Sequence, residues 1–216
     1  MNTNIHKYLV ELQARDDVVG IILFGSWARG NNRPDSDVDL LVIVEQGFKR
    51  TVEYWDTQAF EITYTTEQGA HDYWQANPDD AVELWTVAQV LFDRNGTVAL
   101  LRQFAQQIKE QGKSPLTAEQ YDHSKFDAYD QVKAIVGLAA SDPVTARMLL
   151  STKLFHLTEL FFDIRQWWTP PPKQRLRVIK DRNEALYTLI RRFYNEQALA
   201  EQIRIIRSII PIVFDT

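Results

Sequence analysis

Two short apolar runs, separated by a glycine turn and a polar loop, constrain the fold of this chain more than any other stretch. The first run, Val18–Phe24, has the continuous hydrophobicity of a strand that is buried on both faces. Gly25 and Ser26 end this run, and a polar, turn-forming loop follows. The second run, Val38–Val44, again has strand character. The pattern predicts two core strands with polar side chains gathered at their adjacent ends.

Asp37 and Asp39 stand two positions apart at the start of the second run. Side chains alternate along a strand, so both carboxylates should point to the same face and repel each other. A divalent cation relieves this repulsion, because Mg²⁺ is held by one or two carboxylates together with substrate phosphates. Gly25 and Ser26 offer an anion backbone N–H groups and a hydroxyl. Together these features predict a site for a nucleoside triphosphate and its metal.

The glycine spacing does not make this stretch a P-loop. Gly25 and Gly30 have the right separation, but Asn31 and Asn32 follow where that motif requires lysine and then serine or threonine. The plain structural alternative is a turn glycine with surface aspartates, and either motif alone would favour it. Both motifs in this order, each beside a buried strand, favour the nucleotide site.

The segments Gly25–Gly30 (GSWARG) and Asp35–Leu40 (DSDVDL) resemble the signature of the DNA polymerase β-like nucleotidyltransferase superfamily. Within it, the chain is most similar to small bacterial antibiotic-type and minimal nucleotidyltransferases with a C-terminal helical domain. The resemblance covers roughly the first half of the chain. It implies transfer of a nucleoside monophosphate from an NTP, expected to be ATP, to an acceptor hydroxyl. It also implies two Mg²⁺ ions and release of pyrophosphate.

The resemblance assigns roles to individual residues. Asp37 and Asp39 would hold the metal ions, and Gly25 and Ser26 would bind the β- and γ-phosphates. Arg29 lies one helical turn after Ser26 and matches the motif, so it would either contact phosphate or support the motif loop.

The resemblance also implies a third carboxylate on a strand that follows the Asp-x-Asp strand. Residues 59–65 alternate between apolar and polar side chains, which predicts a strand with Glu61 on the face opposite the aromatic residues. Adjacent strand pairing would bring Glu61 to the two aspartates as a catalytic or metal-binding residue. The alternative is an ordinary exposed glutamate. If Glu61 only binds metal, the base would come from the acidic segment with Asp122, Asp127 and Asp130.

The sequence pattern predicts an α+β protein, with a mixed sheet flanked by helices in residues 1–113, which the resemblance makes the N-terminal nucleotidyltransferase domain, and a helical bundle in residues 114–216. The boundary is placed at Gly112–Pro115, which ends a helix. Residues 46–55 are interpreted as a loop with a short helix, because they are mixed in polarity and contain Gly47. In the second half, one of the helices is expected to run from about 174 to 193.

Lys173 follows two tryptophans and three prolines. In related two-domain nucleotidyltransferases a Pro-Pro-Lys element of this kind recurs after a long helix, so the resemblance makes Lys173 a candidate nucleotide-binding residue. The alternative is a rigid interhelical turn with a solvated lysine.

Composition excludes several classes of function. The chain has no cysteine, which excludes disulfides, thiol catalysis and cysteine-ligated zinc. No apolar run approaches membrane length, and the first residues are too polar for a signal peptide, so a cytoplasmic protein is expected. The net charge of −5 argues against a nucleic-acid partner.

The acceptor is the least constrained part of the prediction. An acidic catalytic domain favours a small hydroxylated acceptor resembling an aminoglycoside. The alternatives are a protein or tRNA acceptor, as in toxin–antitoxin systems, and a non-catalytic nucleotide-binding module. A homodimer is left open, because the apolar segment 203–213 would suit either a core or a dimer surface.

Overall fold

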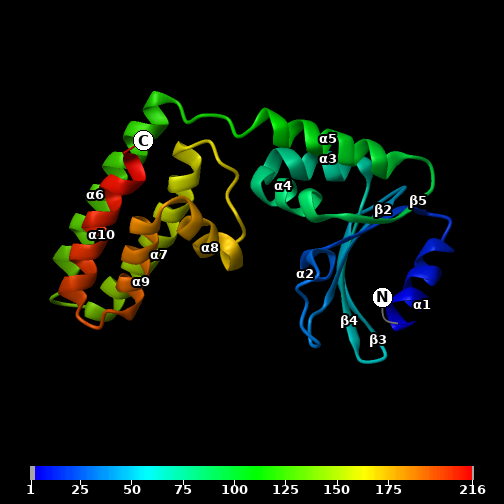
Figure 1. Cartoon of the computed structure of the whole chain (residues 1–216), viewed down its shortest axis with the longest axis horizontal. Helices are drawn as coiled ribbons and strands as arrows, with labels where there is room; N and C mark the ends of the chain where they lie inside the picture. The colour runs from blue at the N-terminus through cyan, green and yellow to red at the C-terminus, as the bar shows by residue number, and fades with distance from the viewer. Residues whose placement is uncertain (1–2, 216) are drawn as a thin grey trace. The chain divides into compact units, whose positions relative to one another are not determined.

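The computed structural model describes residues 3–215, which divide into two compact units between Gln111 and Gly112 (Figure 1). The first unit contains a five-stranded sheet with helices, and the second contains helices alone. The predicted α+β class is therefore confirmed. Within residues 3–215, no helix combines the length and the apolar character that crossing a membrane requires.

The sheet is mixed, and its strands are arranged in the order β3-β4-β2-β1-β5. β2 and β4 are parallel, whereas the other neighbouring strands are antiparallel. The two apolar runs form central strands, with the boundaries predicted from the sequence. The five strands are β1 (Val18–Phe24), β2 (Val38–Val44), β3 (Lys49–Trp55), β4 (Gln58–Thr65) and β5 (Gln89–Asp93).

Within residues 3–111 there are five helices. On one face of the sheet α1 packs into the core, and the centroid of the Tyr8 ring lies 4.3 Å from the centroid of the Phe60 ring on β4. Elsewhere α5 approaches β1 so closely that a Cβ at Gly20 would lie 2.1 Å from the side chain of Val98. These helices are α1 (Thr3–Gln13), α2 (Gly25–Arg29), α3 (Glu67–Ala76), α4 (Pro78–Val87) and α5 (Thr97–Gln111).

The prediction of a loop at residues 46–55 is wrong, because β3 occupies most of this segment. β3 is an edge strand, and edge strands carry charged side chains at little cost. The sequence of β3 does not alternate clearly between apolar and polar residues, because it contains Lys49, Arg50 and Glu53. Its pairing with β4 is nevertheless regular.

In the second unit, residues 112–215 form a bundle of five helices around an apolar core. The predicted helix over 174–193 is wrong in one respect, because Asn183 divides it. The Asn183 side chain accepts a hydrogen bond from the Leu186 N–H at 2.8 Å and so begins a new helix. The helices are α6 (Ala118–Leu138), α7 (Pro143–Ile164), α8 (Pro172–Arg182), α9 (Glu184–Asn195) and α10 (Leu199–Phe214).

Candidate active site

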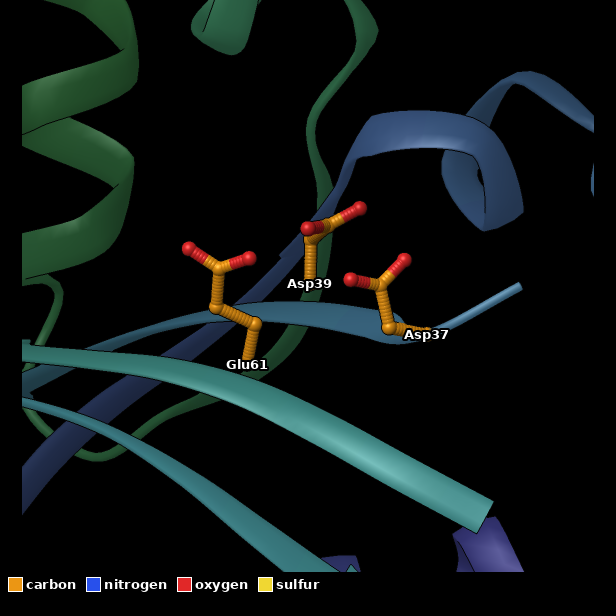
Figure 2. Close-up of side chains that lie close together, drawn as sticks. All are labelled: Asp37, Asp39 and Glu61. Carbon is orange, nitrogen blue, oxygen red and sulfur yellow. The ribbon is translucent and has the colours of Figure 1, made fainter. Parts of the chain in front are cut away.

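Three carboxylates come together on the face of the sheet opposite α1. Asp39 on β2 lies directly across from Glu61 on the parallel strand β4, and Asp37 immediately precedes β2. Each contributes one oxygen to a group whose members all lie within 4.8 Å of one another. Figure 2 shows the three side chains standing on the same side of the sheet. The predicted meeting of Glu61 with the aspartates is thus realised, while its role stays a prediction.

Strand alternation explains how Glu61 reaches this face. Phe60 and Ile62 are fully buried on the side that packs against α1, so the residue between them points the other way. The register of the parallel pair then sets Glu61 opposite Asp39. Asp37 is exposed, whereas Asp39 and Glu61 are half-buried.

The Ser36 carbonyl joins the loop before β2 to two neighbouring elements. It accepts hydrogen bonds from Trp27 Nε1 at 3.3 Å and from Gln58 Nε2 at 3.0 Å. These bonds join the loop to α2 and to β4, so the position of Asp37 follows from two elements that are far apart in sequence.

Gly25 brings the Gly-Ser motif into contact with the carboxylates. Its φ of +66° is a left-handed conformation, and a Cβ there would lie only 1.8 Å from Asp39 Oδ2. A glycine is therefore required for two independent reasons. Ser26 follows at the start of α2, so the expected phosphate-binding residues lie next to the expected metal-binding residues.

Arg50 on β3 is a part of the site that sequence reasoning missed. Its Nε donates to Glu61 Oε1 at 2.9 Å, and its Nη2 forms an ion pair with the same oxygen. These hydrogen bonds, and the nearby negative charge, raise the pKa of the Arg50 guanidinium above its ordinary value. The weak alternation of side-chain character along residues 49–55 could have indicated a strand, but this segment was interpreted as a loop.

Arg29 pairs with a carboxylate of α4, and Lys173 belongs to the helical unit. Arg29 Nη2 forms an ion pair with Glu83 on α4 at 2.6 Å, which corresponds to the loop-support alternative. Lys173 is exposed on α8 in the helical unit. Phosphate or nucleotide contact by either residue stays a prediction.

The acidic segment considered as an alternative base lies on α6. Asp127 accepts a hydrogen bond from the buried Lys153 at 2.9 Å, and this bond lowers the pKa of Asp127. Asp127 is therefore a partner in an ion pair that stabilises the bundle. Asp122 and Asp130 are exposed on the same helix, and no observation assigns them a catalytic role.

Three hollows in residues 3–111 are lined by residues other than the three carboxylates, and one of them, of about 660 Å³, is lined by Glu67 and His71 among others. Another of about 740 Å³ is lined by Trp85 and Arg102 among others, and one of about 520 Å³ is lined by Tyr8 and Arg15 among others. The three carboxylates therefore lie on the sheet face outside these hollows.

Comparison with known proteins identifies the first unit. Residues 5–110 match the nucleotidyltransferase domain family. A Methanocaldococcus jannaschii protein named "Putative protein adenylyltransferase" is 42% identical over 55 residues. This alignment covers 24% of the present chain and 37% of that protein, so the chain spans little more than a third of the length of this relative.

A solved structure shares the fold of almost the whole chain. The crystal structure of a nucleotidyltransferase-like protein from Exiguobacterium sibiricum superposes with a TM-score of 0.55 and 16% identity. The match covers 98% of this chain and 73% of that one, and at this identity it shows the fold alone.

The Gly-Ser and Asp-x-Asp motifs, the sheet that joins them and the family match agree with one another. They support the prediction that the chain is a transferase enzyme. The region of residues 5–110 belongs to the nucleotidyltransferase domain family, and the predicted resemblance to nucleotidyltransferases is confirmed.

Proposed function

We propose that this chain is a Mg²⁺-dependent nucleotidyltransferase that moves a nucleoside monophosphate from an NTP to a hydroxyl group, with AMP from ATP as the first choice. The observation that carries the proposal is the cluster of Asp37, Asp39 and Glu61 in contact with Gly25 through Asp39. A group of carboxylates alone is common on protein surfaces. A carboxylate packed against a left-handed glycine of a Gly-Ser motif is a much more specific arrangement.

The donor set fits magnesium. All three groups offer carboxylate oxygens, the ligands that Mg²⁺ prefers, and small side-chain rotations would let oxygens within 4.8 Å of one another share one or two ions. Asp37 and Asp39 would hold the ions, and Glu61 would complete the site or accept the proton of the acceptor. Bound Mg²⁺ would supply positive charge for the triphosphate and for the developing alkoxide.

The residues of the chain bind and orient the reactants. Gly25 would offer its backbone N–H, and Ser26 its N–H and hydroxyl, to the β- and γ-phosphates. The acceptor oxygen would attack the α-phosphorus and lose its proton to Glu61 or to solvent. The bond from the α-phosphorus to the bridging oxygen would break, and pyrophosphate would leave.

Two acceptor classes have support. The acidic first unit favours a small cationic acceptor such as an aminoglycoside, whereas the Methanocaldococcus relative is named as a protein adenylyltransferase. We place a protein hydroxyl first, because the name of that relative states an acceptor class. The small acceptor stays second, and the net charge of −5 argues against tRNA. A cytoplasmic location and a possible homodimer remain proposals.

The experiment measures pyrophosphate release from each of the four NTPs with Mg²⁺. The protein alone, a soluble protein extract, a panel of aminoglycosides and tRNA serve as acceptors, and the double variant Asp37→Asn/Asp39→Asn is the control. Release that requires a protein and both aspartates is expected. Release only with an aminoglycoside would move the acceptor to the small-molecule class. NTP binding without Mg²⁺ and without release would instead indicate a non-catalytic module.

A further inference from the structure

The contact between Arg50 and Glu61 joins a cation to the carboxylate cluster from a neighbouring strand. In the β3–β4 register Arg50 lies opposite Thr63, and Val52 lies opposite Glu61. Arg50 therefore reaches Glu61 diagonally across the strand pair, along the face that carries the carboxylates. Both of its contacts go to a single oxygen, Glu61 Oε1.

The side chains of Arg50 and Glu61 differ in how freely they can change conformation. The side chain of Arg50 is 69% exposed and extends from an edge strand, whereas that of Glu61 is 29% exposed and extends from an interior strand. Glu61 is thus held by the sheet, and Arg50 can turn into solvent without disturbing the core. An ion pair this exposed is weak, so a stronger cation can replace it.

We propose that Arg50 is a built-in counter-cation that pairs with Glu61 while no divalent ion is bound and gives up this carboxylate when one binds. The inference rests on the proposed function. In the metal-free protein, Arg50 offsets part of the repulsion among three carboxylates that lie within 4.8 Å of one another. After its release, the guanidinium is available to pair with a phosphate oxygen of the incoming NTP.

Arg50 thus acts as a positioning residue that competes with the divalent ion for Glu61, and this competition can be measured without catalysis. Mn²⁺ binding to the full chain is titrated without NTP, by the electron paramagnetic resonance signal of the free ion. We expect Arg50→Gln to bind Mn²⁺ about two- to fivefold more tightly than the wild type, the range that corresponds to the free energy of an exposed ion pair. Arg50→Lys, which keeps the charge, should bind less tightly than Arg50→Gln.

Lys49→Gln is the matched control. It removes the same charge one residue away, but Lys49 lies opposite Tyr64, whose side chain is on the α1 face of the sheet. A change in Mn²⁺ affinity that is smaller for Lys49→Gln than for Arg50→Gln would show that the effect comes from the contact with Glu61, and not from the loss of one positive charge near the site. Equal changes in the two variants would overturn the proposal.

The remaining outcomes separate this inference from the proposed function. If Arg50→Gln binds Mn²⁺ as the wild type does or more weakly, while Asp37→Asn abolishes binding, the counter-cation role is refuted and the metal site stands. If the wild type shows no Mn²⁺ binding that depends on Asp37 and Asp39, the metal site itself fails, and the inference fails with it.

Discussion

Substitution of Gly25 by alanine tests the contact that joins the two motifs. The added methyl group would lie 1.8 Å from Asp39 Oδ2 and 2.6 Å from Asp39 Cγ, far inside van der Waals contact. Asp39 would have to turn away, or the turn at Gly25 would have to shift. Either movement separates the expected phosphate-binding residues from the expected metal-binding residues.

The magnitude can be divided into two parts, because the chain provides a matched control. Gly30 also has a left-handed φ, +70°, but a Cβ there would meet no atom within 4 Å. Gly30→Ala should therefore lose only the conformational preference of glycine, about 1 kcal/mol in the free energy of unfolding. Gly25→Ala adds the steric conflict with Asp39, which costs a further ~1–3 kcal/mol by comparison with overpacked interiors.

The assay combines urea unfolding with Mn²⁺ titration and pyrophosphate release for both variants. We expect Gly30→Ala to be modestly destabilised and to keep Mn²⁺ binding. Gly25→Ala should be destabilised more, by about 2–4 kcal/mol in total, and should lose both binding and turnover. Equal stability of the two variants, with Mn²⁺ binding intact in Gly25→Ala, would refute the idea that this glycine positions Asp39.

Two further predictions concern single carboxylates. Asp37→Asn should abolish turnover and leave the free energy of unfolding within about 0.5 kcal/mol of the wild-type value, because Asp37 is exposed and lies beside two other carboxylates. Unfolding of this variant at urea concentrations that the wild type tolerates would count against a metal role. Asp127→Asn should lower stability by about 1 kcal/mol at pH 7, discounted for solvent screening, since it leaves the buried Lys153 without its carboxylate. The folded-state pKa of Asp127 lies below the unfolded value of about 3.9, so this stabilisation is present above that pH and is lost as the pH falls through the folded-state pKa. Urea unfolding at pH 7 and at several pH values below about 4 should therefore show the stability difference between the two proteins shrinking as the pH falls, and a difference that stays constant in acid would contradict the assignment.

The central strands and the acidic cluster were predictable from local patterns. Continuous apolar runs bounded by glycine and polar residues marked β1 and β2 at their observed ends. Alternation in residues 59–65 set Glu61 on the face opposite Phe60 and Ile62. The resemblance to nucleotidyltransferases then explained why an acidic residue should stand there.

The features that sequence reasoning missed depend on tertiary context. β3 is an edge strand with charged side chains, so its local sequence resembles a loop, and Arg50 was overlooked with it. The division between α8 and α9 depends on the side chain of Asn183, which caps a new helix inside a stretch of helical composition. The contact of Gly25 with Asp39 requires the β1–β2 register, in which Phe24 lies opposite Asp39.

The most direct test of nucleotidyl transfer uses ATP radiolabelled in either the α- or the γ-phosphate. The chain is incubated with Mg²⁺ and a protein or aminoglycoside acceptor, and Asp37→Asn is the control. We expect the α-label to become covalently attached to the acceptor, the γ-label to appear only in pyrophosphate, and the variant to transfer neither. Transfer of the γ-label, or attachment of the α-label that does not need Asp37, would contradict nucleotidyl transfer at the carboxylate cluster.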